Sequence, residues 1–273
     1  MSRRITPPTT HAGRSIPRLT AATTATTAAV TLTVLFALGL TFSFIGAAQA
    51  AAVDVNLGTA DSYAVLAGSA VTNTGPSIIN GNLGVSPGSA VTGFPPGIVN
   101  NGTIHRADAA ASQAKSDLTI AYNQAAAELP PIPVTDDLAG RTLTTGVYNS
   151  TSGLGLTGAL TLDGQGNPDS VWVFQAATTL TTGSASSIVL TNGANACNVY
   201  WQIGSSATLG TGSTFRGSIL AAQSITVTTN VTVLGRVLAR NGAVTLDSDT
   251  IIRPNCSVTT PPASTSPPTS SPT

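Results

Sequence analysis

The apolar positions between residues 53 and 104 fall into short runs that Gly, Asn and Pro separate. Runs of four to eight residues between turn-forming residues are typical of short β-strands. The pattern predicts strands near residues 62–67, 77–79, 81–85, 90–92 and 98–103.

The pattern changes between residues 106 and 129, where apolar side chains recur three and four positions apart. This spacing predicts one amphipathic helix. We expect its apolar stripe to hold Ala110, Ala114, Leu118, Ala121, Tyr122, Ala125 and Leu129. A stripe made mostly of Ala can lie close to a partner surface, so we expect the helix to lie along a sheet rather than in a coiled coil. The prolines at 130 and 131 end it, because proline supplies no backbone N–H.

Residues 142–254 return to short strands, and here a repeat is visible. The segment SATLGTGST at 206–214 aligns with SITVTTNVT at 224–232, an offset of 18 residues. A third copy begins at Ala243, and an earlier one matches from Thr179. A repeat of about 18 to 20 residues made of strand and turn predicts a β-solenoid, whose coils bury their apolar sides by stacking.

The repeat also predicts which side chains face outward. Leu180, Leu209, Val227 and Leu246 take equivalent positions that should point inward, and side chains alternate across a strand. One outward column is then Thr179, Thr208, Thr226 and Thr245, and a second is Thr181, Gly210, Thr228 and Asp247. The turn after them carries Thr182, Thr211, Thr229 and Ser248. Thr at this density with almost no charge is unusual, although Thr also simply favours strands.

The first fifty residues do not resemble part of a folded domain. Four Arg residues precede an uncharged apolar run at 30–45, and a small-x-small site follows at 48–50. This order predicts a secretory signal peptide cleaved near Ala50, with a retained membrane anchor as the alternative. The run is shorter than the about 20 residues that span a bilayer. We therefore expect a secreted protein that meets the membrane only through its signal.

Composition excludes several function classes. Beyond residue 50, seven basic and eleven acidic side chains remain, a net charge of −4, and no basic patch for nucleic acid is present. Lys115 is the only Lys and His105 the only His in this part, so acid–base and nucleophilic catalysis have little material. We expect no enzyme activity, no cofactor and no small-molecule substrate.

The two cysteines are predicted to pair in an oxidising compartment, with two buried thiols as the alternative. A bridge between Cys197 and Cys256 would clasp the end of the fold to its middle. Beyond it, residues 258–273 are rich in Pro, Ser and Thr and read as a disordered or extended tail.

The chain contains several longer motifs: LGTADSYAVLAGSAVTNTG at 57–75, GVSPG at 84–88, VTGFPPG at 91–97, VWVFQ at 171–175, CNVYW at 197–201, GSSATLGT at 204–211 and GRVLARNGAVTL at 235–246. Together they resemble the microbial ice-binding proteins of the DUF3494 family. The resemblance spans about residues 55–254. It implies a mainly β fold: a right-handed, discontinuous β-solenoid of triangular cross-section, formed by coils from both ends of the chain, with one long α-helix alongside. The domain would cover residues 51–257.

The resemblance also implies a function. Family members bind ice through one flat solenoid face that is often rich in Thr, so we expect a monomer whose partner is ice or ordered water. The expected contact residues are Thr179, Thr181, Thr208, Thr211, Thr226, Thr228, Thr229 and Thr245. An adhesion module with the same fold and no ice activity is the alternative.

Other chemistry-bearing residues suggest little. A polysaccharide lyase or hydrolase would need clustered carboxylates or a basic residue in a groove. Asp247 and Asp249 with Arg236 and Arg240 are the candidates, and we interpret them as solvated outward charges. Asp163 and Asp169 flank a turn too sparse in acidic ligands for calcium. His105 is interpreted as a turn residue before the helix.

Overall fold

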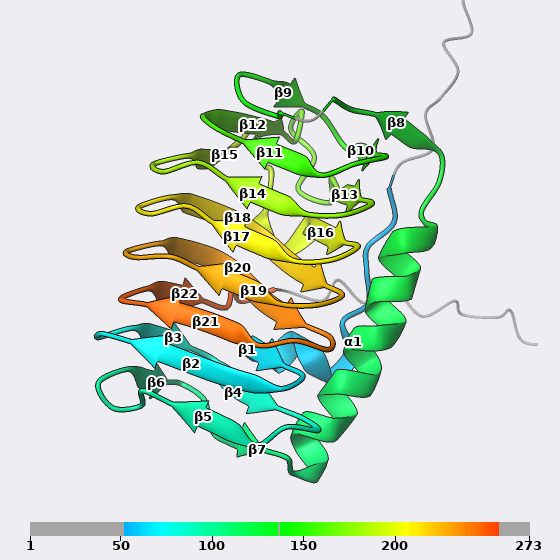
Figure 1. Cartoon of the computed structure of the whole chain (residues 1–273). Coiled ribbons are helices and arrows are strands. Elements are labelled where there is room, and N and C mark those ends of the chain that lie inside the picture. The colour runs from blue at the N-terminus through cyan, green and yellow to red at the C-terminus, as the bar shows by residue number, and fades with distance from the viewer. Residues whose placement is uncertain (1–51, 136, 257–273) are drawn as a thin grey trace, which may run out of the picture. The chain divides into compact units, whose positions relative to one another are not determined.

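The computed structural model describes residues 52–135 and 137–256, which form a stack of short coils with one helix beside it (Figure 1). The predicted signal peptide at 1–50 and the tail at 258–273 lie outside the described residues. A complete coil contributes one strand to each of three parallel stacks. Within the described part, no helix has the length and apolarity needed to cross a membrane. The predicted solenoid with one helix is confirmed, and the handedness of its coils and their triangular cross-section stay predictions.

One stack lies under the helix. It consists, in spatial order, of β7 (Ile104–Arg106), β4 (Asn82–Val85), β1 (Tyr63–Ala67), the second half of β20 (Thr232–Ala239), the second half of β18 (Thr214–Ala221), β16 (Val199–Ile203), β13 (Trp172–Ala176), β10 (Gly146–Ser150) and β8 (Pro131–Pro133). The chain segment before β1, which includes the 3₁₀ turn η1 (Gly58–Ser62), packs against this stack and the helix.

The second stack is a separate seven-stranded sheet that no helix covers (Figure 1). Its order is β11 (Leu154–Leu156), β14 (Leu180–Thr182), β17 (Ala207–Leu209), β19 (Ile225–Val227), β21 (Val244–Asp247), β2 (Ala70–Thr74) and β5 (Ala90–Thr92). We call it the open sheet.

The third stack closes the coils and is called the rear stack. Its order is β9 (Thr142–Leu143), β12 (Ala159–Asp163), β15 (Ser187–Thr191), the first halves of β18 and β20, β22 (Thr250–Ile252), β3 (Ile78–Asn80) and β6 (Ile98–Asn100). β18 and β20 each serve two stacks because they bend at Gly217 and Gly235. The backbone of Gly217 has φ +102°, and a Cβ on Gly235 would lie 1.8 Å from the carbonyl oxygen of Gly217. Only glycine fits at this corner.

The spatial order of the coils is not their order in the chain. The N-terminal strands β1, β2 and β3 pair with β20, β21 and β22, so the first coil of the sequence stacks on the last. We call this junction between the first and the last coil the seam. Asp249 joins its two sides, because its backbone N–H donates to Ser77 Oγ at 2.9 Å and its carbonyl accepts from Ile78 N–H at 2.7 Å. The expected discontinuous solenoid, built from both ends of the chain, is therefore present.

Apolar side chains from all three stacks fill the interior. Its aromatic part is a row in which Tyr148, Phe174, Trp201 and Phe215 come from successive coils, with centroid separations of 5.4, 3.9 and 5.1 Å. The indole N–H of Trp201 donates to the carbonyl of Arg216 at 3.0 Å, which satisfies its polar atom. Each large buried side chain contributes roughly 1.5–3 kcal/mol, so coil stacking dominates the stability.

The helix α1 (Ala109–Ala127) is shorter than the predicted 106–129. It begins after Asp108, whose carboxylate caps Ala111 N–H at 2.8 Å. Its last carbonyls are satisfied by Gln175 of β13, which donates to Ala125 and Glu128. The buried stripe is Ala111, Ala114, Leu118, Ala121 and Ala125.

Two members of the predicted helical stripe were wrong. Ala110 is exposed, because the regular three- and four-residue spacing starts at Ala111. Leu129 is 69% exposed, because it follows the end of the helix. Tyr122 packs at the margin of the buried cluster.

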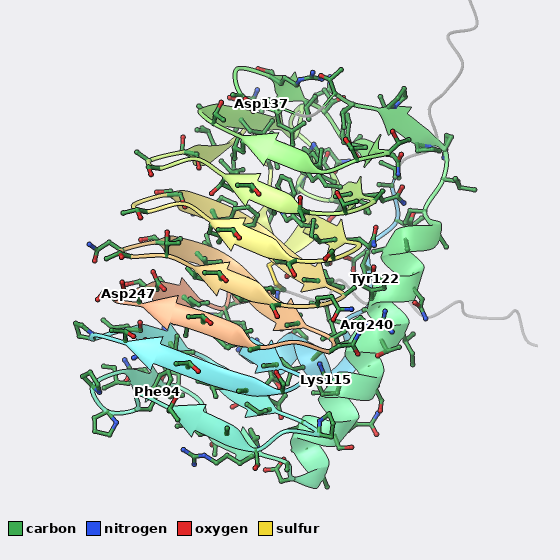
Figure 2. All side chains as sticks on the ribbon, in the orientation of Figure 1. Phe94, Lys115, Tyr122, Asp137, Arg240 and Asp247 are labelled. Carbon is green, nitrogen blue, oxygen red and sulfur yellow. A yellow bond between two sulfur atoms is a disulfide. The ribbon has the colours of Figure 1, made fainter. Side chains whose placement is uncertain are left out.

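Lys115 of the helix bonds to the strand stack beneath it instead of extending into solvent (Figure 2). Its Nζ donates to the carbonyl oxygens of Ala239 and Arg240 at the end of β20. The Arg240 guanidinium lies 4.4 Å from the ring centre of Tyr122. Burial, and then the charge of Arg240, lower the pKa of Lys115 to about 7.

The lowered pKa of Lys115 predicts a pH-dependent stability. Unfolded Lys115 keeps its proton up to its ordinary pKa of 10.5, whereas the folded side chain loses it near pH 7. The unfolded state therefore binds more protons between these values, and the free energy of unfolding should rise from about pH 7 to pH 10. Urea unfolding of the wild type and of Lys115→Met across this range measures it, and the variant should lack the rise. A flat wild-type profile would show that buried Lys115 keeps its proton.

A disulfide joins Cys197, in the middle of η2 (Ala196–Asn198), to Cys256, 59 positions further on, and holds the last described residues. Arg236, only 1% exposed, reinforces the same region by donating to the carboxylate and the carbonyl of Asp61. The expectation that Arg236 is a solvated charge was wrong, because its guanidinium joins β20 to the segment before β1.

Removing the disulfide should lower the free energy of unfolding by about 2–4 kcal/mol, since a long loop is released in the unfolded state. The double variant Cys197→Ala, Cys256→Ala tests this by urea denaturation, with reduced wild-type protein as the matched comparison. Equal stability of oxidised wild type, reduced wild type and variant would contradict the role given to the bridge.

Candidate functional site

The open sheet presents a column of outward threonines, one from each of six successive coils. The strand register aligns Thr181 with Thr208, Thr208 with Thr226, Thr226 with Thr245, Thr245 with Thr72 and Thr72 with Thr92. Gly155 continues the column on β11. We call the six threonines, Thr181, Thr208, Thr226, Thr245, Thr72 and Thr92, the threonine column. Their inward neighbours, such as Ala207, Leu209, Ile225 and Val227, are fully buried or nearly so.

The side chains flanking the threonine column are short. Two positions earlier on each strand, the register places Thr179, Ser206, Ser224, Ala243, Ala70 and Ala90. Two positions later it places Gly183, Gly210, Thr228, Asp247 and Thr74. Two positions after Thr92, beyond the end of β5, Phe94 is half-buried and packs against the core. None of the large exposed hydrophobic side chains found in the described part belongs to this sheet. The threonine column therefore stands on a broad, low surface.

The hydroxyls of the threonine column are available to an external partner. Among the described residues, none of the six side chains makes a hydrogen bond to protein. Thr228 differs, since its hydroxyl donates to the carbonyl of Leu209 at 2.7 Å and meets Thr211 Oγ1 at 3.2 Å. Thr229 Oγ1 donates to Asp247 at 2.6 Å. Thr211, Thr228 and Thr229 thus use their hydroxyls inside the turn that ends the sheet.

The predicted register of the coil at 179–182 was wrong by two residues. Leu180 pairs with Ala207 rather than Leu209, so Thr181 joins the column and Thr179 lies two positions before it. Thr182 consequently points inward, is 4% exposed and accepts a hydrogen bond from Gly210 N–H at 2.9 Å. The alignment failed because this coil keeps the Thr-x-Thr pattern while its inward residues differ from those of later copies.

Sequence reasoning missed Thr72 and Thr92, which extend the column across the seam. Their segments, AVTNTG at 70–75 and AVTGF at 90–94, contain the same apolar–Thr alternation as AVTLD at 243–247. That likeness was the available signal. It was hidden because these coils precede the helix, far from the repeat in the chain.

Charge near the threonine column is confined to its margin. Asp247 lies at the end of β21 (Figure 2), where Thr229 and Ser248 donate to its carboxylate. The expectation that Asp249 is a solvated charge was wrong. Its side chain is fully buried, and its carboxylate accepts from the N–H groups of Val231 and Asp247. Burial raises the pKa of Asp249 to about 7. Arg240 lies over Tyr122, and Arg236 binds Asp61. The four charged candidates Asp247, Asp249, Arg236 and Arg240 therefore form no catalytic cluster.

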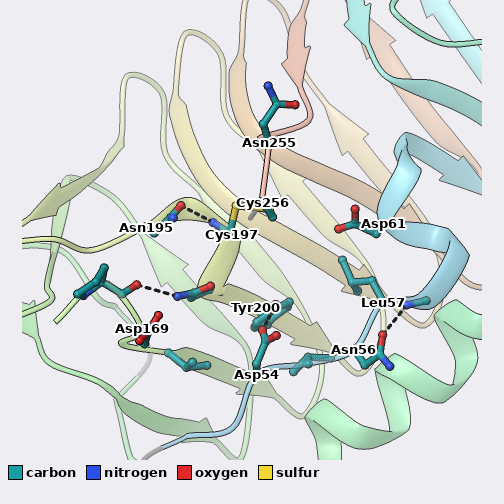
Figure 3. Close-up of a pocket in the computed structure, with 15 residues that line it drawn as sticks. Asp54, Asn56, Leu57, Asp61, Asp169, Asn195, Cys197, Tyr200, Asn255 and Cys256 are labelled. Carbon is teal, nitrogen blue, oxygen red and sulfur yellow. Dashed lines mark hydrogen bonds between the residues drawn. A yellow bond between two sulfur atoms is a disulfide. The ribbon is translucent and has the colours of Figure 1, made fainter. Parts of the chain in front are cut away.

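A groove lies away from the open sheet, beside the disulfide (Figure 3). Its volume is about 670 Å³, and Asp54, Asp61, Asp169 and Tyr200 line it. Asp61 is paired with Arg236 and Arg253, and Asp54 accepts from the Tyr200 hydroxyl. Burial, and then this bond, raise the pKa of Tyr200. The carboxylates of Asp54 and Asp61 are thus already engaged by protein side chains.

The remaining candidates have structural roles. Asp163 accepts from Gln165 N–H at 2.8 Å and from Asn192 at 2.9 Å in a turn, while Asp169 lies at the groove. The interpretation of His105 as a turn residue was wrong, because it lies on strand β7, where its Nδ1 is 2.8 Å from the helix-capping Asp108. Across residues 52–135 and 137–256, no three His, Cys, Asp or Glu side chains gather closely enough to hold a metal ion.

Comparisons with known proteins agree with the fold. A model of the ice-binding-like family matches residues 65–252. An ice-binding protein of Nostoc sp. (strain HG1) is 52% identical over 211 residues, 77% of each chain. One from Flavobacterium frigoris (strain PS1) is 35% identical over 73% of this chain and 76% of its own. The crystal structure of an ice-binding protein from the Antarctic ascomycete Antarctomyces psychrotrophicus is 45% identical, with a TM-score of 0.72, over 75% of this chain and all of that one.

The strand register can be tested by thiol labelling. Thr181→Cys should react rapidly with a maleimide in folded, non-reduced protein because residue 181 is exposed, whereas Thr182→Cys should stay protected until the protein unfolds. Mass spectrometry over time measures both. Faster labelling at 182 than at 181 would restore the register expected from the sequence and remove Thr181 from the column.

Proposed function

The chain belongs to the ice-binding-like family, and from that premise we propose that it adsorbs to ice through the threonine column. Adsorption would depress the freezing point and inhibit recrystallisation. The observation that carries the proposal is the alignment of six threonines with free hydroxyls on a low, nearly uncharged sheet.

The geometry suits a partner made only of water. Strands in a sheet are about 4.7–4.9 Å apart and outward residues along one strand about 6.5–7 Å apart, so the open sheet is a grid. Thr is stiff at its first side-chain torsion because its Cβ is branched. Its methyl group orders adjacent water and its hydroxyl anchors it, and such ordered water counts as part of the interface.

Rigidity explains why a solenoid serves this purpose. The parallel ladder fixes each threonine relative to the next coil, and the packed interior holds the ladder from behind. Little conformational freedom is left to lose when water orders on the surface. Adsorbed molecules would then pin an advancing ice front, which must curve between them and therefore freezes at a lower temperature.

The proposal assigns no catalytic step. The relatives named above are named as ice-binding proteins. Asp54 and Asp61 of the groove and the buried Asp249 use their carboxylates in hydrogen bonds or ion pairs within the fold. We assign a secreted monomer with residues 1–50 as its signal peptide and residues 258–273 as its tail. Ice is its partner, and it needs no cofactor.

A double substitution tests the threonine column directly. Thr208→Tyr with Thr226→Tyr should abolish most of the gap between melting and freezing temperatures, because two rings raised above the grid keep neighbouring threonines away from ice. The fold should survive, since outward strand positions tolerate change at a cost of about 1 kcal/mol or less. Nanolitre osmometry and ice shaping under a microscope measure the loss.

Asn123→Tyr is the matched control, since Asn123 is exposed on the helix. It should leave activity unchanged, and thermal melting should confirm that every variant is folded. Full activity in the folded double variant would move the ice-contacting surface elsewhere. A wild type that leaves crystals as round discs, with no gap between melting and freezing, would instead favour the adhesion module.

A further inference from the structure

The rear stack carries a second column of hydroxyls that the threonine column does not include. The register aligns Ser187 with Thr214, Thr214 with Thr232 and Thr232 with Thr250. The residue after each points inward: Ile188, Phe215, Val233 and Ile251 are at most 1% exposed. Ser187, Thr214, Thr232 and Thr250 therefore face outward from four successive coils, and we call them the rear strip.

The rear strip continues into exposed apolar side chains. Thr250 pairs with Ile78 and Ile78 with Ile98, so the column crosses the seam as isoleucine. Ile78 and Ile98 are 39% and 48% exposed, and Val189, two positions after Ser187, is 42% exposed. Three of the six large exposed hydrophobic side chains found among the described residues thus lie on this one stack.

The rear strip is contiguous with the threonine column around the edge of the coils. The turn from β19 to β20 carries Thr228 and Thr229 between Thr226 and Thr232. In the preceding coil, Thr211 lies between Thr208 and Thr214 and contacts Thr228. Hydroxyl-bearing side chains therefore follow one another from the open sheet to the rear stack.

The hydroxyls of the rear strip are as free as those of the threonine column. In the described part of the chain, Ser187, Thr214, Thr232 and Thr250 make no side-chain hydrogen bond. The neighbouring outward column holds a single charged side chain, Arg216, beside Val189, Leu234 and Ile252. A charged protein or anionic polymer would find little to pair with here.

We propose that the rear strip is a second ice-contacting surface, set at an angle to the threonine column by the turns between the two stacks. The inference rests on the proposed function and extends it. Ice fits as the occupant because the strip is uncharged, repeats at the coil spacing, combines hydroxyls with methyl groups and adjoins the first surface. Two surfaces facing different directions engage crystal planes of different orientation.

Fluorescent labelling of a single-crystal ice hemisphere tests the rear strip. Wild-type protein should label planes of more than one orientation. Thr232→Tyr with Thr250→Tyr should lose one set of labelled planes and keep another, while Thr208→Tyr with Thr226→Tyr should show the reverse. Thr142→Tyr, exposed on the same stack but outside the strip, is the matched control and should label as wild type.

The outcomes separate this inference from the proposed function. A folded Thr232→Tyr, Thr250→Tyr variant that labels every wild-type plane and keeps its full freezing gap would overturn the rear strip alone. Wild-type protein that labels no ice would overturn the function as well. Loss of wild-type self-association in that variant by analytical ultracentrifugation, with ice labelling unchanged, would make the strip an interface between copies and overturn it as an ice surface.

Discussion

The parallel backbone ladder between successive coils is the interaction on which the rest of the structure depends. It fixes the spacing of the coils, and with it the alignment of every outward and inward column. The critical part is the seam, where β2 pairs with β21 and β3 with β22. Without these pairs the edge of the last coil would be bare, and an unpaired strand edge invites association with other chains. The threonine column would then end at Thr245.

The seam is held by side chains that are buried because the two ends of the chain meet there. Arg236 reaches Asp61, which precedes β1, and Asp249 binds Val231 N–H on one side while its backbone N–H donates to Ser77 on the other. Helix α1 covers the stack under it across the seam, packing on Leu66 from the N-terminal part and on Leu220 and Leu238 from the C-terminal part. Buried groups of this kind are costly unless they are paired, as Arg236 is, or hydrogen-bonded, as Asp249 is. Their pairing therefore joins the two ends of the chain in one specific arrangement.

The sequence allowed the solenoid, the helix and four coils of the repeat to be predicted, because a period near 18 residues and a 3.6-residue period are visible without any contact information. It could not show that Thr72 and Thr92 continue the column of Thr245, since stacking order is a tertiary property. It also could not show that Thr181 faces outward in line with Thr208 while Thr182 points inward, because the turn of this coil differs from those of its neighbours. Arg236 and Asp249 were misread as solvated because their partners, Asp61 and Ser77, lie more than 170 positions away. Free and internally bonded threonines, such as Thr226 and Thr228, look alike in sequence and differ only in their contacts.

A crystal structure that resolves ordered water on the open sheet would test the central claim most directly. The account predicts a row of waters lying between the threonine column and its neighbours, repeating once per coil at about 4.7–4.9 Å and continuing without a break from Thr245 to Thr72. The six threonines should share one side-chain rotamer. Waters without this repeat, or a break in the row at the seam, would contradict the view that both ends of the chain build one continuous ice-contacting grid.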